Sequence, residues 1–437
     1  MSDILEVESM DLEARGISHN NGKVVFINGA LTGEKVVVDI LKSKKSYDVA
    51  KVRDILVKSI YRVDPPCKYF GVCGACSMQH LDYKTQIAIK QRVLEDSILH
   101  IGKTRPDFIS YSIHGYILKY RYRARFSIKF LIENYSVFIG FNELNSNNIA
   151  DINSCLVLHD KISELIVFLR ELISSLSIVS NVLNIEVSMG DNLIVHLIIS
   201  YLGVLSNNDK ILLQFFEKKH NVKWWLRQNS SHAICQLNET NEVELYYSIP
   251  EFNLLINYHP SDFTQVNHDI NRIMISKVVS LLDVKPFDKV LDLFCGLGNF
   301  TLPLARVSSK VLGVDVNHLL ISRACKMSVY FKLNNVVSFM TANLFNINVS
   351  WFLRIGFFDL VVLDPPRDGA FAVSKALSLL PKKQSPRRII YVSCNPATLA
   401  RDVNVLVSNG KYTIRSSGII NMFSHTSHIE SITVLEL

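Results

Sequence analysis

Cys394 is the residue of this sequence whose type and position best suit a nucleophile. It follows the apolar run 389–392 and precedes Asn395 and Pro396. Because proline fits the first turn of a helix, the pattern predicts a strand that ends at the thiol and a helix that starts just after it. A cysteine at such a corner is rigidly held and open to a ligand. Since a thiolate must form before attack, we expect positive or hydrogen-bonding groups around Cys394.

The loop at residues 295–301 has the composition of a cofactor site. It follows a predicted strand at 290–294, and two glycines, Gly296 and Gly298, allow its backbone to approach a ligand closely. Thr301 stands where a dinucleotide site carries a third glycine, which disfavours a pyrophosphate. Asp315 ends the next predicted strand, where a carboxylate can bind both ribose hydroxyls. Together these features indicate S-adenosylmethionine. Asp364 follows a further strand, 358–363, and is expected at the same edge.

Three cysteines lie close together in a loop that is rich in proline and glycine. Cys67, Cys73 and Cys76 have intervening segments of five and two residues, and a further thiol, Cys155, lies far downstream. Closely spaced thiols in a chain without secretory signals indicate a metal site. This spacing suits an iron–sulfur cluster better than zinc, which often uses paired Cys-x2-Cys units. Zinc remains the alternative.

The elements that must position these residues fall into three stretches, as a length of 437 residues also suggests. Residues 1–60 carry short β-type runs with glycine turns and predict a small β-barrel with a basic second half. Residues 61–258 mix strands and helices, including an amphipathic helix at Lys161–Ser177. Residues 259–437 alternate strands with helices. The predicted fold class is therefore α/β, with a doubly wound Rossmann-like domain at the C-terminal end.

The net charge of +7 makes an anionic partner plausible. The segment Lys119–Lys129, taken as one strand, puts five cations on one face and aromatic residues on the other; the cations are Lys119, Arg121, Arg123, Arg125 and Lys129. Such a row can track an RNA backbone, although a solvated face is the plainer interpretation. Phe263 either stacks on bases or packs in the core.

The apolar stretch 192–206 predicts a buried strand and is too short for a membrane span. We expect a reduced, cytoplasmic monomer that does not bind membranes.

The chain resembles the RNA uracil-5 methyltransferases along nearly its whole length. The motifs that carry the resemblance are Phe263-Thr-Gln265-Val-Asn267, Leu291-Asp-Leu-Phe-Cys-Gly-Leu-Gly-Asn299, Asp364-Pro-Pro-Arg367, Tyr391-Val-Ser-Cys-Asn-Pro-Ala-Thr-Leu-Ala-Arg-Asp402 and Met422-Phe-Ser-His-Thr-Ser-His-Ile-Glu430. The resemblance implies that Cys394 is the nucleophile and Glu430 the base. It also implies an S-adenosylmethionine pocket formed by Gln265, Phe294, Asn299, Asp315, Asn343 and Asp364.

The same resemblance implies a [4Fe–4S] cluster on Cys67, Cys73, Cys76 and Cys155. Three positions depart from the family pattern: Asp315 replaces glutamate, and Asn421 and Ser424 replace an aspartate and a proline before the base. The start, Arg15–Lys35, looks like a TRAM barrel that binds RNA. A barrel combined with the cluster cysteines is similar to the branch that methylates 23S ribosomal RNA. A transfer-RNA enzyme is the alternative. Residues 79–110, helical from Thr85 to Leu99, are expected to pack with the C-terminal sheet.

The chemistry explains the residue types. C5 of uracil is too weak a nucleophile to accept a methyl group directly. Addition of a thiolate to C6 creates an enolate with electron density at C5, which then attacks the methyl sulfonium, and a base must remove the C5 proton before the thiolate leaves. Two rival classes fit less well. A radical methylthiotransferase uses Cys-x3-Cys-x2-Cys, and a cytosine-5 methyltransferase has proline before its cysteine rather than after it.

Overall fold

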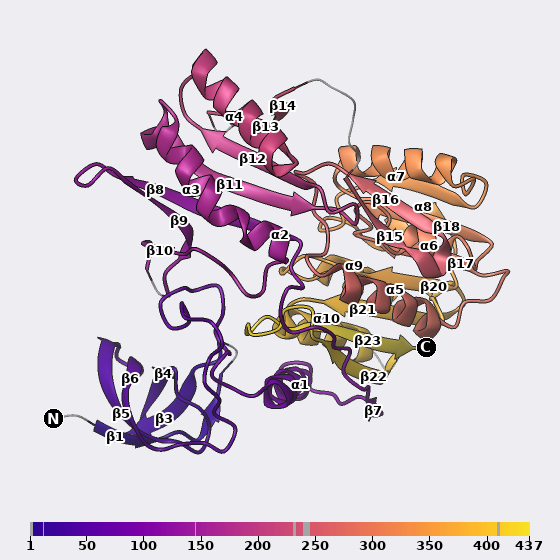
Figure 1. Cartoon of the computed structure of the whole chain (residues 1–437). Helices are drawn as coiled ribbons and strands as arrows, with labels where there is room; N and C mark the ends of the chain where they lie inside the picture. Colours follow the sequence, from indigo (N-terminus) through magenta and orange to yellow (C-terminus); the bar gives the residue numbers. More distant parts are fainter. Residues whose placement is uncertain (1–2, 12, 145, 230–232, 239–244, 409–410) are drawn as a thin grey trace.

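The computed structural model describes residues 3–11, 13–144, 146–229, 233–238, 245–408 and 411–437. Their strands form a six-stranded, a seven-stranded and an eight-stranded sheet and a two-stranded hairpin. In Figure 1 the N-terminal sheet lies at the lower left, the seven-stranded sheet above it, and the eight-stranded sheet at the right. Short 3-10 turns occur at Val179–Asn181, Pro250–Phe252 and Lys382–Gln384. No helix of the described chain is long and apolar enough to cross a membrane.

The N-terminal sheet has the order β1-β5-β6-β4-β3-β2. Its strands are β1 (Asp3–Glu6), β2 (Ser9–Met10), β3 (Gly16–Asn20), β4 (Lys23–Asn28), β5 (Lys35–Ser43) and β6 (Tyr47–Val57). The two edge strands, β1 and β2, belong to one segment. Between them, the N–H of Val7 donates to Glu34 O and the N–H of Glu8 donates to Ile17 O. One segment thus borders the sheet at both ends, around a small core that includes Val25, Ile27 and Val36.

The central sheet has the order β10-β9-β8-β11-β12-β13-β14. Its strands are β8 (Arg123–Leu131), β9 (Ser136–Asn142), β10 (Ile149–Asp151), β11 (Val182–Met189), β12 (Val195–Tyr201), β13 (Val222–Gln228) and β14 (Cys235–Gln236). The predicted helix at Lys161–Ser177 is present as α2 (Asp160–Ser163) and α3 (Leu165–Ser175), which with α4 (Asn207–His220) contributes to the core of this sheet. All seven residues of β12 are buried, so the apolar stretch 192–206 contains the predicted buried strand.

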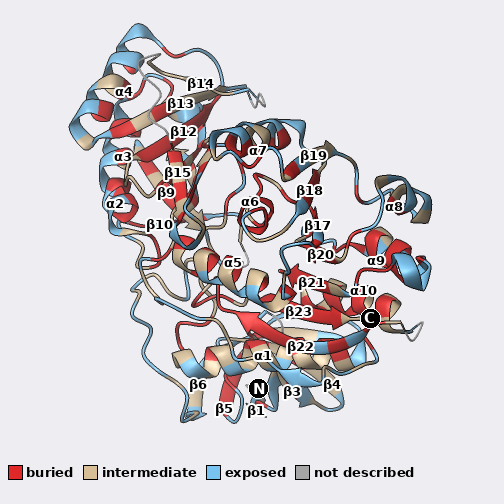
Figure 2. Ribbon diagram, turned by 90° about the vertical axis from the view of Figure 1, so that its right-hand side faces the viewer, coloured by how far each residue is buried: buried red, intermediate tan, exposed pale blue. Residues whose placement is uncertain are grey.

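The C-terminal sheet has the order β19-β18-β17-β20-β21-β23-β22-β7. Its strands are β7 (Phe108–Ile109), β17 (Lys289–Leu293), β18 (Lys310–Asp315), β19 (Val337–Thr341), β20 (Leu360–Leu363), β21 (Arg388–Ser393), β22 (Thr413–Ile420) and β23 (Glu430–Glu436). The first five strands in this order are parallel, and β23 runs antiparallel to β21. The strands of this sheet are mostly red in Figure 2, because both faces are covered. This is the doubly wound α/β architecture that the alternation predicted.

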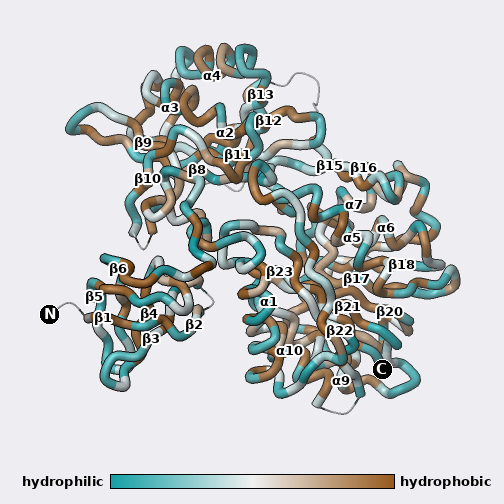
Figure 3. Tube along the Cα trace, turned by 60° about the horizontal axis from the view of Figure 1, so that its bottom comes forward, coloured by the Kyte–Doolittle hydropathy of each residue, from teal (hydrophilic) through white to brown (hydrophobic). Residues whose placement is uncertain are grey.

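Helices cover both faces of that sheet. One face packs against α5 (His268–Leu282), α6 (Thr301–Leu304), α7 (His318–Tyr330) and the hairpin of β15 (Leu245–Ile249) and β16 (Leu254–Tyr258). The other face packs against α1 (Tyr83–His100), α8 (Val349–Ile355), α9 (Phe371–Leu379) and α10 (Pro396–Ser408). In Figure 3 these helices alternate between brown and teal along their length, as amphipathic helices do. The hairpin precedes the boundary that we placed at residue 259, yet its buried side chains belong to this C-terminal core.

The segment 79–110 is part of the C-terminal packing although it lies far away in the sequence. Helix α1 buries Leu94 and Ile98 in the same apolar cluster as Leu399 and Val403 of α10. Strand β7 pairs in parallel with β22 through Ser416 and Ser417. The chain therefore enters the central sheet only after it has contributed a helix and an edge strand to the C-terminal sheet.

Candidate active site

The candidate functional residues meet at one edge of the eight-stranded sheet. Phe294, Asp364 and Cys394 directly follow the parallel strands β17, β20 and β21, and Asp315 ends β18. The chain order of the strands changes direction between β17 and β20. In open α/β sheets a ligand binds outside the carboxyl ends of the strands at such a switch point. The topology therefore places a ligand site where these four residues converge.

Cys394 lies at the strand-to-helix corner that its surroundings predicted. Strand β21 ends at Ser393 and α10 begins at Pro396. The side chain of Asn395 fixes the corner in two directions. Its Oδ1 accepts from the N–H of Ala397 at 3.1 Å, and its Nδ2 donates to the carbonyl of Arg367 at 3.0 Å. The turn that holds the thiol is therefore tied directly to the loop that follows Asp364.

Glu430 lies beside the thiol of Cys394 because the strands that carry them are neighbours in the sheet. Strands β21 and β23 pair antiparallel from Arg388 opposite Glu436 to Ser393 opposite Ser431. One further step in this register brings Cys394 opposite Glu430, although 36 positions separate them in the sequence. Glu430 is buried, and its charge acts on the thiol. The structure thus brings the predicted nucleophile and the predicted base together.

The electrostatics of this pair differ from our expectation of a thiolate-favouring environment. Burial, reinforced by the carboxylates of Glu430 and Asp364, raises the pKa of Cys394 to about 11, while Arg367 and a backbone hydrogen bond act in the opposite direction. Burial and the charge of Asp364 also raise the pKa of Glu430 well above its ordinary value. The expected positive and hydrogen-bonding neighbours are present as Arg367 and a backbone hydrogen bond, but burial and the two carboxylates outweigh them, because a negative charge nearby repels a negative sulfur. The thiol of the free protein is therefore protonated at neutral pH.

At the ends of β17 and β18, the carboxylate of Asp315 lies against backbone N–H groups of the loops that follow. Asp315 accepts from the N–H of Gly296 at 3.0 Å through Oδ2 and from the N–H of Asn317 at 2.8 Å through Oδ1. Phe294 and Gly296 have positive φ angles of 65° and 53°, and the unusual conformation of Phe294 brings its ring to 5.7 Å from that of Phe345. A non-glycine residue with such a φ marks a constrained turn that the surrounding structure holds in place.

The other three predicted cofactor residues differ in how firmly they are held. Asn299 exchanges hydrogen bonds with the amide of Asn271 at 3.0 and 2.9 Å and accepts from the hydroxyl of Tyr247. Asn343 is exposed after β19, and its Oδ1 accepts from the N–H of Phe345. Gln265 is half-buried just before α5. Phe294, Asp315 and Asp364 therefore lie at the carboxyl edge of the sheet and Asn299 in the loop after β17, whereas Asn343 follows the edge strand β19 and Gln265 precedes α5.

Two buried residues beneath the cofactor loop were not assigned a role from the sequence. Asp292 is fully buried, and Thr301 donates its hydroxyl to one of the carboxylate oxygens, while the other oxygen has no partner among the described residues. Burial raises the pKa of Asp292 to about 7. The sequence did carry a signal for the unusual position of Thr301, because this threonine stands where a dinucleotide-binding loop has its third glycine. Gly313 leaves the room that this threonine needs, since a Cβ there would lie 2.9 Å from its Oγ1.

The four predicted cluster cysteines line one small pocket together with mainly apolar side chains. Burial raises the pKa values of Cys73, Cys76 and Cys155, that of Cys76 to about 12. Within the described ranges, however, no three His, Cys, Asp or Glu side chains are placed so that they could hold a metal ion. The chain therefore gathers the thiols around one space without bringing them to ligating distance. A deprotonated, metal-bound state would relieve their raised pKa values.

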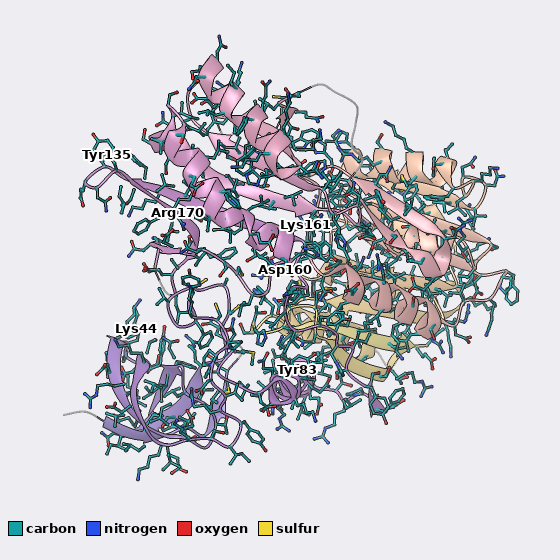
Figure 4. All side chains as sticks on the ribbon, viewed as in Figure 1. Lys44, Tyr83, Tyr135, Asp160, Lys161 and Arg170 are labelled. Atoms are coloured by element: carbon teal, nitrogen blue, oxygen red, sulfur yellow. The ribbon has the colours of Figure 1, made fainter. Side chains whose placement is uncertain are left out.

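The predicted row of cations is not one strand. Strand β8 starts only at Arg123, and Lys119 has a positive φ and pairs with Asp160, one of the residues labelled in Figure 4. Arg123 is partly buried and donates to the carbonyls of Pro260 and Asp262. Its role is therefore to hold the loop before Gln265 rather than to meet solvent. On the same strand, Arg125 and Lys129 remain exposed.

An open cleft runs from the cysteine loop to the segment that carries Thr426 and His428. It is lined by Gly74 and Ala75 of that loop, by Arg121 and Arg125 of the central unit, and by His428, which lies two residues before Glu430. Arg367 donates to Nδ1 of His428 at 3.1 Å. Phe263 is 71% exposed, which excludes the core role that we considered for it. The cleft thus has cations along it and, at His428, meets the loop that leads to Glu430.

Comparison with known proteins agrees with this arrangement. The family model described as tRNA (Uracil-5-)-methyltransferase matches residues 82–437. A relative from Bordetella bronchiseptica, named 23S rRNA (uracil(1939)-C(5))-methyltransferase RlmD, is 48% identical over 436 residues, which cover 100% of this chain and 93% of the relative. A protein of the same name from Nitrosospira multiformis is 45% identical and covers 98% of this chain and 97% of its own length.

A solved structure shares the fold. It is the Pyrococcus abyssi tRNA (uracil-54, C5)-methyltransferase in complex with S-adenosyl-L-homocysteine, with a TM-score of 0.74, 23% identity and coverage of 100% of both chains. The family model covers most of this chain, and the curated relatives match it from end to end at more than 40% identity. The chain therefore belongs to the RNA uracil-5 methyltransferase family.

Proposed function

We propose that this chain transfers a methyl group from S-adenosylmethionine to C5 of a uridine in 23S ribosomal RNA and so forms 5-methyluridine. As a member of its family, the chain is an S-adenosylmethionine-dependent methyltransferase. The ribosomal substrate is supported by the names of full-length relatives such as the Bordetella and Nitrosospira proteins. The single observation that carries the mechanism is the register that sets Cys394 opposite Glu430 beside the loop of Asp364.

The residues present fit S-adenosylmethionine. Asp315 offers carboxylate oxygens to ribose hydroxyls, and the Phe294–Gly298 turn provides backbone close to the carboxyl end of β17. The unpartnered oxygen of Asp292 lies beneath the same turn. When bound, the cofactor supplies an electrophilic methyl group. Gln265, Phe294, Asn299, Asp315, Asn343 and Asp364 are the residues proposed to hold it.

In the proposed reaction, the Cys394 thiol first gives its proton to water, its Sγ then adds to C6 of the uracil, and the resulting enolate carries electron density at C5. After C5 has taken the methyl group, Glu430 removes the C5 proton, and the C6–S bond breaks to release the thiolate. Burial raises the pKa of Glu430, which makes its carboxylate a stronger base for this proton. Arg367 lowers the pKa of Cys394, so its guanidinium is the group that favours the thiolate during attack and departure.

The test separates the two roles. Cys394→Ala should abolish methylation while RNA binding is kept, because the side chain contributes a bond rather than the RNA surface. Glu430→Gln should complete methyl transfer but retain the RNA as a covalent adduct, visible as a slower band on a denaturing gel. An RNA substituted with 5-fluorouridine should be trapped on Cys394 of the wild-type protein. Normal turnover by Cys394→Ala would show that the mechanism is wrong.

We also propose that Cys67, Cys73, Cys76 and Cys155 hold a [4Fe–4S] cluster that joins the loop at 67–76 to the segment at 152–157. Support comes from the single pocket that all four line, together with mainly apolar neighbours. The cluster would organise this RNA-facing region, and no step of the proposed methylation needs electron transfer. Protein purified without oxygen should be brown, with iron and sulfide in equal amounts. A colourless protein with stoichiometric zinc would favour the alternative metal.

The proposed RNA surface combines three parts. The basic edge of the N-terminal sheet, whose two borders are formed by one segment, supports a TRAM-like barrel over residues 1–60. The cleft of Arg121 and Arg125 leads from the central unit, residues 61–258, to the methyltransferase unit that follows. Phe263 offers an exposed ring for stacking on a base. A deletion strain distinguishes the substrates: loss of 5-methyluridine from 23S rRNA supports the proposal, and loss from tRNA alone supports the transfer-RNA alternative.

A further inference from the structure

The loop at residues 421–429, here called the base loop, connects β22 to Glu430 and is held by parts of the chain that are distant in sequence. The N–H groups of Ser77 and Met78 both donate to the carbonyl of His425 at 3.0 Å. Gln86 of α1 accepts from the N–H of His425 at 3.0 Å, and Tyr120 donates to the carbonyl of Ser424 at 2.9 Å. The position of Glu430 therefore depends on contacts outside the sheet.

One of these contacts is made by a buried amine. Lys90 of α1 is only 2% exposed. Its Nζ donates to Oδ1 of Asn421 at 2.8 Å and to the carbonyl of Phe423 at 2.9 Å. Figure 4 shows the surroundings of this helix, with Tyr83 labelled about two turns before Lys90 and the C-terminal strands close by. Lys90 is thus anchored to the base loop at two points.

Both acceptors of this amine are uncharged. The group is paired with no carboxylate among the described residues, and burial alone lowers the pKa of Lys90 to about 7. The titratable groups that face it are Tyr83 on its own helix, Tyr120, and His425 and His428 of the base loop. Burial lowers the pKa values of both histidines, and a charge on Lys90 lowers them further. None of these neighbours therefore supplies a negative charge near neutral pH.

The side-chain amide of Asn421 hydrogen-bonds to the amine at one end and to a hydroxyl at the other. Its Oδ1 accepts from Lys90 while its Nδ2 donates to the hydroxyl of Ser424 at 3.2 Å. Its own N–H donates to the carbonyl of Ile113 at 2.7 Å. An amide can accept at one end and donate at the other, whereas a carboxylate could not donate to Ser424. Asn421 and Ser424, two of the positions that depart from the family pattern, therefore act as one hydrogen-bonded unit.

We propose that Lys90 is a positioning residue for the base, which it fixes through its two hydrogen bonds to the base loop. The inference rests on the proposed function, because it concerns the proton-removal step assigned to Glu430. A charged amine at this position has no anion beside it. Protonation of Lys90 at acidic pH should therefore destabilise its contact with the base loop. Removal of the C5 proton should therefore depend on the protonation state of Lys90 and on its hydrogen bonds, whereas addition of Cys394 and methyl transfer should not.

The first experiment follows the covalent adduct in single-turnover reactions of the full-length protein. Lys90→Met keeps the apolar stem and removes both hydrogen bonds. We expect methyl transfer at a normal rate but release slowed by about tenfold or more, so that a protein–RNA adduct accumulates. Lys84→Met, at an exposed position on the same helix, is the matched control and should leave both rates unchanged. A folded Lys90→Met variant that releases RNA normally would overturn the inference.

The second experiment does not depend on whether Lys90→Met folds. Asn421→Asp places a carboxylate beside the amine and raises the pKa of Lys90, so the acid limb of the release rate should move to higher pH by about one unit. An unmoved limb would also overturn the inference. The variant Glu430→Gln distinguishes failure of the proposed function from failure of the role proposed for Lys90. If that variant forms no adduct, the proposed function fails; if it does form one while both other variants behave like wild type, only the role of Lys90 fails.

Discussion

Arg123 and Arg125 lie two positions apart on β8 and should respond to truncation in opposite ways. The guanidinium of Arg123 is partly buried and donates to the carbonyls of Pro260 and Asp262 and to the hydroxyl of Thr264. Arg125 is exposed in the cleft that leads to His428. Because the sequence alternation put both residues on one face, it could not distinguish a structural arginine from an RNA-binding one.

The expected magnitudes follow from these contacts. Arg123→Ala leaves three acceptors without their donor, and each hydrogen bond from a charged group contributes about 1.5–3 kcal/mol at full strength. Because the site is only partly buried, we expect a loss of about 2–4 kcal/mol in unfolding free energy and a displaced 260–264 loop. Arg125→Ala should leave stability within about 0.5 kcal/mol. It should instead lower the salt slope of RNA binding by about one.

Two measurements on each variant test this reasoning. Urea unfolding gives the stability change, and filter binding of a 23S rRNA fragment over a range of salt concentrations gives the slope. Lys129→Ala, at an exposed position further along β8, controls for the loss of any surface cation. An Arg123→Ala variant that is as stable as wild type but has a reduced salt slope would refute the assignment and restore Arg123 to the RNA interface.

Three further outcomes are expected. Thr301→Val removes the hydroxyl donor of buried Asp292, so cofactor affinity should fall by about tenfold in calorimetry while RNA binding is unchanged; a Thr301→Ser variant should retain most of the affinity. Asp315→Asn should weaken S-adenosylhomocysteine binding by about tenfold or more, because it replaces one of the acceptors for the ribose hydroxyls, and equal affinity would exclude this role. Burial lowers the pKa of Lys90 in the folded state, so the unfolded chain holds the extra proton between about pH 7 and pH 10.5, and stability should rise with pH across that window by up to about 1.4 kcal/mol per unit. The difference in thermal midpoint between wild type and Lys90→Met, measured at several pH values, should therefore grow toward alkaline pH in favour of wild type, and a constant difference would contradict the pKa assignment.

The sequence by itself determined the elements whose signal is local. The apolar run before Cys394 and the proline after it specify a strand-to-helix corner, and β21 and α10 end and begin where that pattern requires. The glycine loop, Asp315 and the alternation of strands and helices specify a doubly wound sheet with its ligand edge, because these depend on φ angles and on spacing along a few residues. The motif around Cys394 and Glu430 was specific enough to indicate the family before any fold was known.

Only the tertiary structure decided the features that depend on burial and on distant partners. The register of β21 with β23 brings Glu430 to Cys394, and burial together with nearby carboxylates raises the pKa of the thiol despite the positive and hydrogen-bonding neighbours that we expected. Packing of α1 against the C-terminal sheet buries Lys90 beneath the base loop, and the 260–264 loop takes Arg123 away from solvent. Local patterns report which face a side chain occupies, but desolvation and hydrogen-bond partners are set by what the rest of the chain places on that face.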